Sequence, residues 1–322
     1  MLLAGDIGGT KTILALYSED KQDFAPFAKE TYKSKEFHSL EQVLEKFLLD
    51  RKEKITKACF GVAGPVIEGL SKTPNLPWII GEESLKKCLK TQKVHLINDL
   101  LANAYGIKTL SSHDFFVLNK GEEDERGNQG LISAGTGLGE AGIISIEGER
   151  VPFASEGGHC SFSPKNDLDL EFLYYLRKKY SGHVSIERVL SGQGLENIYS
   201  FLIEEKQMAP LQGLENAKSL PAAISEAAKL KENEAATMTL DLFVRHYGAE
   251  AGDVALKFLA TGGIFLGGGI APKILPFLQK TSFLESFCDK GRLQGVLEKI
   301  PIKVILNHET ALRGAGFFVK NL

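Results

Sequence analysis

The sequence predicts an α/β protein with two similar halves around a cleft. Strand-like apolar runs alternate with helix-like segments, which favours sheets whose sites lie at the carboxyl ends of strands. A hairpin with a turn rich in glycine and threonine occurs near the start and again near the middle, and such self-similarity indicates an internal repeat. The length of 322 residues allows two domains, at roughly 100 to 200 residues per domain.

The first domain is expected to be a small α/β domain over residues 1–108 plus 304–322. LLAGDIGGTKTILALYS predicts two strands around a turn, and FHSLEQVLEKFLLDRKEK has the apolar spacing of an amphipathic helix. ACFGVAGPV and KVHLINDL predict further strands, with LLANAYGI as the helix that follows. At the end of the chain, KVILNH predicts a strand and ETALRGAGFFVK a helix.

The second domain is expected to be a larger α/β domain over residues 109–303. The acidic GEEDERGNQG predicts a solvated loop, and LISAGTGLGEAGIIS repeats the opening order of strand, turn and strand. GGIFLGGGIAPKILPFL predicts a strand, a turn and a helix. Longer helices are expected at DLDLEFLYYLRKKY, SIERVLSGQGLENIYSFLIEEK and ENEAATMTLDLFVRHYGAEAGDVALKFLA.

Composition and charge exclude several classes of function. The formal net charge of -3 offers no positive field to a nucleic acid. The start MLLAGDIGGTK lacks the features of a signal peptide, and the uncharged run between Lys257 and Lys273 is too short and glycine-rich to span a membrane. The cysteines have no CxxC spacing, which favours a reducing cytoplasm over a disulfide framework or a zinc knuckle. They are Cys59, Cys88, Cys160 and Cys288.

The first turn, GDIGGTKT, resembles a phosphate-binding P-loop but does not fit one. Thr10 rather than glycine precedes Lys11, and the strand-like ILALYS follows, whereas a P-loop leads into a helix. A hairpin turn explains the pattern better, because its glycines let backbone N–H groups approach a phosphate beside Thr10, Lys11 and Thr12. On this stretch alone, a purely structural tight turn is an equally good interpretation.

Two further glycine clusters favour the phosphate interpretation. AGTGLGEAG, from Ala134 to Gly142, again places glycine and threonine between two strands. GGIFLGGGI precedes a predicted helix whose N-terminus suits a nucleotide. Three such clusters are more than turns alone require.

Seven motifs together resemble the bacterial ATP-dependent glucokinase family of sugar kinases. They are, in order, GDIGGTKT, GVAGPV, INDLLANA, SAGTGLGEA, SEGGH, ERVLSGQGLEN and GGIFLGGGI. The resemblance implies two similar domains of the actin-like ATPase (ribonuclease H-like) type around a cleft for ATP and sugar, in the superfamily of hexokinase, actin and Hsp70. It also implies phosphorylation of glucose at its 6-hydroxyl, with ATP and Mg²⁺ as cofactors, and a homodimer.

The resemblance assigns the glycine clusters to ATP. The first hairpin would hold the metal and phosphate end, with the Asp6 carboxylate as the partner of Mg²⁺ through water; the second would approach the β- and γ-phosphates. Gly267, Gly268 and Gly269 would lie against adenosine. The ATP-binding residues expected in the hairpins are Asp6, Gly8, Gly9, Thr10, Lys11, Gly135, Thr136 and Gly137. Close relatives frequently carry asparagine in place of Lys11.

The resemblance likewise assigns six residues to glucose: Asn75, Asn98, Asp99, Glu156, His159 and Glu187. Carboxylates and amides suit pairs of neighbouring sugar hydroxyls. Two alternatives stay open. Glu156 and His159 have the i, i+3 spacing of a metal pair, although Gly157 and Gly158 lie between them and no third ligand is near. Glu187 could belong to a capping box with Ser185 as the N-cap and Arg188 solvated.

Asp99 has two candidate roles. It directly precedes the predicted helix LLANAYGI, so it could cap that helix, and the helix dipole there favours a charged carboxylate. It is also the residue that would act as general base toward the sugar 6-hydroxyl. The two roles are compatible.

Rival functions remain within the same fold. A kinase for fructose or mannose would use the same cleft, and a non-catalytic sugar sensor or repressor is a rival of another class. A repressor is disfavoured because the first hairpin already starts at Gly5. Sugar kinases of the repressor and open-reading-frame type carry a cysteine-rich zinc motif after their Glu-Gly-His segment, and only Cys160 stands there in this chain.

Overall fold

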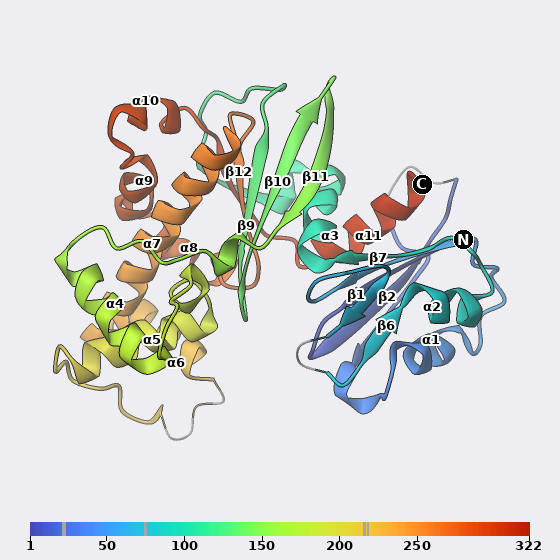
Figure 1. Ribbon diagram of the computed structural model, residues 1–322, viewed down its shortest axis with the longest axis horizontal. Helices are drawn as coiled ribbons and strands as arrows, with labels where there is room; N and C mark the ends of the chain where they lie inside the picture. Colours follow the sequence, from blue (N-terminus) through green and yellow to red (C-terminus); the bar gives the residue numbers. More distant parts are fainter. Residues whose placement is uncertain (21–23, 74–75, 215–216, 218) are drawn as a thin grey trace. The chain divides into compact units, whose positions relative to one another are not determined.

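A computed structural model describes residues 1–20, 24–73, 76–214, 217 and 219–322. Asn75, one of the expected sugar residues, lies outside them. The chain divides into two compact units (Figure 1): unit 1 comprises Met1–Asp114, Val151–Ala154 and Asn307–Leu322, and unit 2 comprises Phe115–Arg150 and Ser155–Leu306. The expected domains over 1–108 plus 304–322 and over 109–303 stay a prediction. Within the described residues, no helix is both long and apolar enough to cross a membrane.

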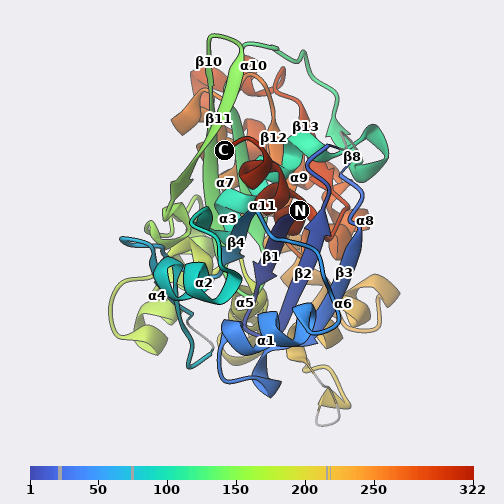
Figure 2. The ribbon, with the colours of Figure 1, turned by 90° about the vertical axis from the view of Figure 1, so that its right-hand side faces the viewer.

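The main sheet of unit 1 has the strand order β3-β2-β1-β4-β7, and β3, β2, β1 and β4 lie side by side in Figure 2. β1 and β2 form an antiparallel hairpin, and β4 and β7 continue the sheet parallel to β1. The strands are β1 (Leu2–Ile7), β2 (Lys11–Tyr17), β3 (Ala28–Lys33), β4 (Lys57–Val62) and β7 (Val94–Asn98), while β5 (Leu70–Lys72) pairs with β6 (Ile79–Gly81).

Helices cover both faces of this sheet (Figure 1), because the sequence of β1 is apolar on both sides. Leu3 and Ile7 belong to the hydrophobic cluster that includes residues of α1 (Leu40–Leu48) and α2 (Glu82–Leu89). Leu2 and Ala4 belong to the cluster on the other face, with α3 (Asp99–Gly106) and α11 (Thr310–Lys320). Side chains alternate along a strand, so Asp6 faces α3 and α11 as well.

The second large sheet has the order β11-β10-β9-β12-β13-β8, and its strands other than β11 lie in unit 2. It repeats the plan of unit 1, because β9 and β10 form an antiparallel hairpin and β12 and β13 continue parallel to β9. The expected repeat of two similar halves is therefore present. The strands are β8 (Phe115–Asn119), β9 (Gln129–Ala134), β10 (Leu138–Ile146), β11 (Glu149–Ser155), β12 (Ile264–Gly267) and β13 (Ile302–Ile305).

Seven α-helices of the described residues pack with this sheet around one large hydrophobic core. They are α4 (Asp167–Tyr180), α5 (Gly192–Glu204), α6 (Leu220–Leu230), α7 (Glu234–Phe258), α8 (Leu275–Leu278), α9 (Thr281–Cys288) and α10 (Gln294–Leu297). Two sequence predictions were too simple. The segment SIERVLSGQGLENIYSFLIEEK holds a 3₁₀ turn, Ile186–Arg188, followed by α5, because the side chain of Ser191 caps α5 at a new start. After β12 a 3₁₀ turn, Ala271–Ile274, precedes the short α8.

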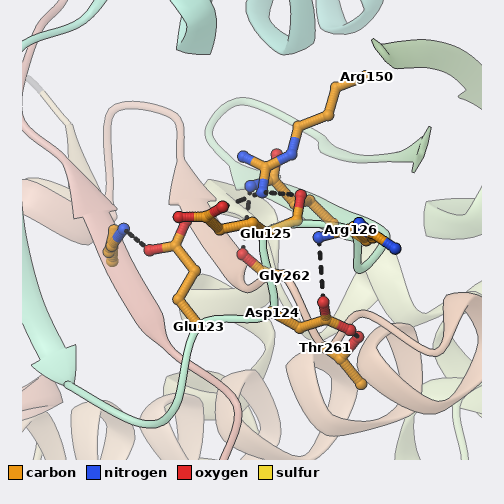
Figure 3. A network of polar contacts seen from close by, with 9 residues as sticks. Glu123, Asp124, Glu125, Arg126, Arg150, Thr261 and Gly262 are labelled. Carbon is orange, nitrogen blue, oxygen red and sulfur yellow. Dashed lines mark hydrogen bonds and ion pairs between the residues drawn. The ribbon is translucent and has the colours of Figure 1, made fainter. Parts of the chain in front are cut away.

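The acidic loop GEEDERGNQG is exposed over residues 122–126, so the expectation of a solvated loop is confirmed. Its contacts with other segments were not expected. Figure 3 shows that its side chains are tied to neighbouring segments of unit 2. Glu123 forms ion pairs with Arg150 and with Lys303, at 3.8 and 2.9 Å. Asp124 accepts a hydrogen bond from the Thr261 hydroxyl at 2.9 Å. The acidic residues are thus paired with basic and polar groups that are distant in sequence.

Candidate active site

The centre of the site in unit 1 is a pair of carboxylates, Asp6 on β1 and Asp99 at the start of α3. In the sheet register, Asp6 is paired with Gly61 of β4. A Cβ added to Gly61 would lie 3.8 Å from the Asp99 Cα and 3.0 Å from the Ala102 Cβ. The absence of a side chain at Gly61 therefore lets the first turn of α3 lie close to the strand beside Asp6.

The electrostatics of this pair are unfavourable without a cation. Burial, and after it the negative charge of Asp99, together raise the pKa of Asp6 to about 7. Loss of hydration and a neighbouring like charge both disfavour the charged carboxylate. A positive ion or a donor of hydrogen bonds beside Asp6 would reverse both effects.

The cap of α3 is Asn98, so the expectation that Asp99 is the cap was wrong. The Oδ1 of Asn98 accepts the amides of Leu100 and Leu101, at 2.9 and 3.2 Å, and its Nδ2 donates to the Gly64 carbonyl at 3.1 Å. Asp99 takes the first helical position, and its Oδ1 accepts the Leu100 amide at 2.9 Å. Asn98 joins the GVAGPV loop to the helix and thereby orients Asp99.

The first glycine turn, between β1 and β2, is braced from one side by Ser34. The Ser34 hydroxyl donates to the Gly8 carbonyl at 2.7 Å and lies 3.0 Å from the hydroxyl of Thr12, which is buried. Thr12 therefore has a structural role, and the expectation that its hydroxyl lies beside a phosphate was wrong. Thr10 and Lys11 are exposed, and Lys11 stands opposite Lys33 in the strand register.

The second glycine turn, Gly135 to Gly137, lies beside the third glycine cluster in unit 2. Gly192, at the start of α5, donates its amide to the Gly135 carbonyl at 2.8 Å, and the Ile270 amide donates to the Ala134 carbonyl at 3.2 Å. Gly268 has φ of +80°, and a Cβ there would lie 2.2 Å from the Ala134 carbonyl oxygen. A side chain at Gly268 would thus separate the two clusters.

The expected sugar residues Glu156 and His159 lie on one tight turn that rests on β10. The His159 amide donates to the Glu156 carbonyl at 3.0 Å, and both side chains are exposed, with His159 Nε2 and Glu156 Oε2 3.9 Å apart. Gly158 approaches the β10 backbone, because a Cβ there would lie 2.1 Å from the Leu138 carbonyl oxygen. Within the described residues no group of three or more His, Cys, Asp and Glu side chains could hold a metal ion.

Glu187 packs on the second glycine turn. Its Oε2 accepts the Leu138 amide at 3.0 Å and lies where a side chain on Gly137 would be, 2.4 Å from an added Cβ. The alternative of a capping box is not realised, because the Ser185 side chain makes no capping hydrogen bond to the 3₁₀ turn that carries Glu187. Arg188 is not merely solvated either, since its guanidinium lies over the Tyr180 ring, 4.3 Å from the centroid.

The structure therefore gathers the expected site residues in two groups. Unit 1 brings together Asp6, the first glycine turn, Asn98 and Asp99, and unit 2 brings together the Glu156–His159 turn, Glu187 and the other two glycine clusters. Three residues that shape these two groups were not among the expected site residues. They are Gly61, Ser34 and Glu140, a buried residue of β10 that packs against Gly157. Gly61 carried a detectable signal, a glycine inside an apolar strand pattern, which indicates close approach of another segment.

Comparison with known proteins identifies the family of this chain. The family model described as Glucokinase matches residues 3–322. The chain belongs to the glucokinase family. It is 40% identical over 339 residues to a glucokinase of Nostoc punctiforme, covering 100% of this chain and 99% of that one.

Solved structures place the fold in the same family of enzymes. A glucokinase crystal structure from an Antarctic psychrotroph has a TM-score of 0.86 at 32% identity and covers 100% of this chain and 99% of its own. A ROK family glucokinase from Streptomyces griseus, solved in complex with glucose and AMPPNP, has a TM-score of 0.66 at 19% identity, covering 100% of this chain and 99% of that one. This more distant likeness shows the fold, of the actin-like ATPase type, and the glucokinase family supplies the enzyme class.

Proposed function

We propose that this protein transfers the γ-phosphoryl group of ATP to the 6-hydroxyl of glucose, with Asp99 as the general base. The observation that carries the proposal is the pairing of Asp6 with Asp99 across Gly61. One carboxylate of the pair suits a metal and phosphate, and the other suits a sugar hydroxyl. Membership of the glucokinase family supports the choice of glucose and ATP.

The sugar residues in this proposal are Asn98, Asp99, Glu156, His159 and Glu187, with Asn75 as a further candidate. Glu156 and His159 have exposed side chains on one turn, so their carboxylate and imidazole groups can reach neighbouring hydroxyls of the sugar. One oxygen of Glu187 is used by the Leu138 amide, so we assign the other oxygen to the sugar. Such groups reject analogues that lack the matching hydroxyl, because they would be left unpaired.

The ATP residues in this proposal follow the three glycine clusters. Gly8, Gly9, Thr10 and Lys11 would contact phosphate from the first turn, and Gly135, Thr136 and Gly137 from the second. Gly267, Gly268 and Gly269 would contact adenosine; Gly267 is buried as the last residue of β12, while the other two are exposed. We further propose that units 1 and 2 are the two domains of the enzyme and that both contribute to one reaction.

The residues present fit a Mg²⁺ ion. Mg²⁺ prefers oxygen ligands and is commonly held by one or two carboxylates together with substrate phosphates and water. Asp6 supplies such a carboxylate, at a position where burial and a second carboxylate already disfavour uncompensated negative charge. When bound with ATP, the ion would supply neutralisation of the charge on the phosphoryl group.

The protein's own contribution is orientation and proton transfer. Asn98 fixes the first turn of α3 through its cap, and Gly61 fixes the distance of that turn from β1. Asp99 would then accept the proton of the 6-hydroxyl as this oxygen attacks the γ-phosphorus. Positioning and electrostatic stabilisation make up most of the catalysis of phosphoryl transfer, and the base adds to them.

The test of this proposal is the variant Asp99→Asn. Asparagine retains an Oδ1 for the Leu100 amide and removes only the basic oxygen, so the protein should fold and still bind glucose. A general base contributes typically about 10²- to 10⁴-fold, and kcat is expected to fall by that factor or more in a coupled assay of ADP. Asp20→Asn, an exposed aspartate in the same unit, serves as the control. Near-parental kcat in Asp99→Asn would refute the base assignment.

Two further points complete the proposal. Assays with glucose, fructose and mannose under the same conditions test the sugar, and a higher kcat/KM for fructose or mannose would replace glucose as the substrate. We also propose a cytoplasmic homodimer, by likeness to the family and from the cysteine pattern. Light scattering on the purified chain should give twice the mass of 35.2 kDa, and the mass of one chain would contradict the dimer.

A further inference from the structure

The turn with Glu156 and His159 is built directly on a buried acid, Glu140 of β10. Glu140 is 1% exposed. Its carboxyl occupies the place of a side chain at Gly157, because an added Cβ there would lie 2.0 Å from Glu140 Oε2. A shift of this carboxyl toward Gly157 would therefore press on the backbone between Glu156 and His159.

Behind Glu140 lie the charged groups of α7. Glu250 is 8% exposed, and its Oε1 accepts a hydrogen bond from the Lys257 ammonium at 3.1 Å. Glu250, Lys257 and Asp253 all act electrostatically on Glu140. Asp253 is itself paired with Lys290 at 2.5 Å. Lys257 supplies a positive charge to this group, but its single charge cannot balance both glutamates.

The two glutamates require a proton. The buried Oε1 of Glu140 receives no hydrogen bond from the described residues, and the carboxyl of Glu250 lies near enough to act on Glu140. Ionised carboxylates only accept hydrogen bonds, so two of them close together in a buried site favour protonation of one. Burial, and after it the charge of Glu250, together raise the pKa of Glu140 to about 8.

We propose that neutral Glu140, packed against Gly157, positions the Glu156–His159 turn for sugar binding. This inference rests on the proposed assignment of that turn to glucose. Loss of the proton would place two adjacent negative charges in a dry site, and their repulsion would push the Glu140 carboxyl against Gly157. Glu140 is a positioning residue, since it acts on the sugar through the turn.

The proposal predicts a specific dependence of glucose affinity on pH. If only the neutral form holds the turn in place, glucose should bind the parent protein about tenfold more weakly at pH 9 than at pH 7, one unit above and one below the transition. Glu140→Gln keeps a neutral donor of similar shape, so its affinity should match the parent at pH 7 and stay constant to pH 9. Glu140→Ala should bind about tenfold more weakly at both pH values.

The experiment is isothermal titration of glucose into the full-length protein at pH 7, 8 and 9. Asp169→Asn is the matched control, because Asp169 is a buried acid of the same unit that pairs with His246 instead, at 3.5 Å. This control should keep the tenfold loss of the parent. If Glu140→Gln shows the same loss as the parent, the inference is wrong, and it is equally wrong if folded Glu140→Ala binds like the parent. Should Glu140→Ala not fold, the comparison of Glu140→Gln with the parent decides.

A third variant separates this inference from the proposed function. Glu156→Ala removes an exposed side chain of the turn without touching Glu140. If Glu156→Ala binds glucose as the parent does, the assignment of the turn to the sugar fails, and the inference falls with it. If Glu156→Ala binds weakly while both Glu140 variants behave like the parent at every pH, the sugar assignment holds and the inference alone is refuted.

Discussion

Gly61→Ala tests how closely the reaction depends on the position of α3. The added Cβ would lie 3.0 Å from the Ala102 Cβ, whereas carbon atoms make their best contacts at about 3.5–4.0 Å. The helix must therefore recede by about 0.5–1 Å at Ala102, one turn after Asp99. Such overpacking costs typically about 1–3 kcal/mol of stability.

The same displacement should lower turnover. Misplacing a reacting group by about 1 Å can cost on the order of 10²-fold in rate, and Asp99 is carried on the first turn of the displaced helix. We expect Gly61→Ala to remain folded with a lower melting temperature and to lose about 10- to 100-fold in kcat. Coupled detection of ADP at saturating glucose and ATP measures the rate, and calorimetry measures the stability.

The double variant Gly61→Ala/Ala102→Gly isolates the cause. It moves one methyl group from the helix to the strand, so the spacing of the two backbones is kept, although glycine inside a helix costs about 1 kcal/mol. We expect the double variant to recover most of the lost kcat without recovering full stability, while Ala102→Gly alone keeps near-parental kcat. Parental kcat in Gly61→Ala, or no recovery in the double variant, would refute the reasoning.

Further expected outcomes concern the cap, the nucleotide turn and the buried acid. Asn98→Ala should lose about 1 kcal/mol of stability, because it removes the cap of α3. Asn98→Ser should recover this stability but not the affinity for glucose, as titration of each variant with denaturant and with glucose would show. Gly268→Ala should lower the melting temperature, because its added Cβ meets the Ala134 carbonyl. Gly269→Ala has open space around the added Cβ, so it should leave the stability unchanged and raise the KM for ATP. The folded-state pKa of Glu140 lies above its ordinary value of 4.5, so the parent should lose stability relative to Glu140→Gln as pH rises from about 4.5 to 8, by up to about 1.4 kcal/mol per pH unit. Urea unfolding across that range measures the difference, and a constant difference would contradict the raised pKa.

Local patterns were sufficient to predict the strands and turns that carry the site. β1 and β2 follow from two apolar runs around Gly8 and Gly9, and β9 and β10 follow from the same signal around Gly135. The start of α3 follows from an apolar strand that ends in Asn98. These elements depend on residues that are adjacent in sequence, and short-range periodicity reports on them directly.

The roles of individual side chains could not be predicted, because they depend on partners that are distant in sequence. Thr12 looked like a phosphate ligand, but Ser34 on another segment holds its hydroxyl inside the protein. Glu187 contacts Leu138, 49 positions away in the chain. Glu140 is an acid in an apolar strand, and its surroundings depend on charged groups of α7, Glu250 and Lys257. No local pattern specifies which segments meet in this way.

The repeated topology allows the two glycine hairpins to be compared position by position, and they differ chemically at one equivalent strand residue. Asp6 lies two residues before the first turn and faces Gly61 of the next parallel strand, and Ser133 lies two residues before the second turn and faces Gly267 in the same way. Both halves therefore put a glycine beside the same strand position, which leaves room for another group to approach. In unit 1 this group is the start of α3, and the strand residue is an acid suited to a cation. In unit 2 the equivalent residue is the neutral Ser133, which would not repel the phosphate that we propose this turn binds.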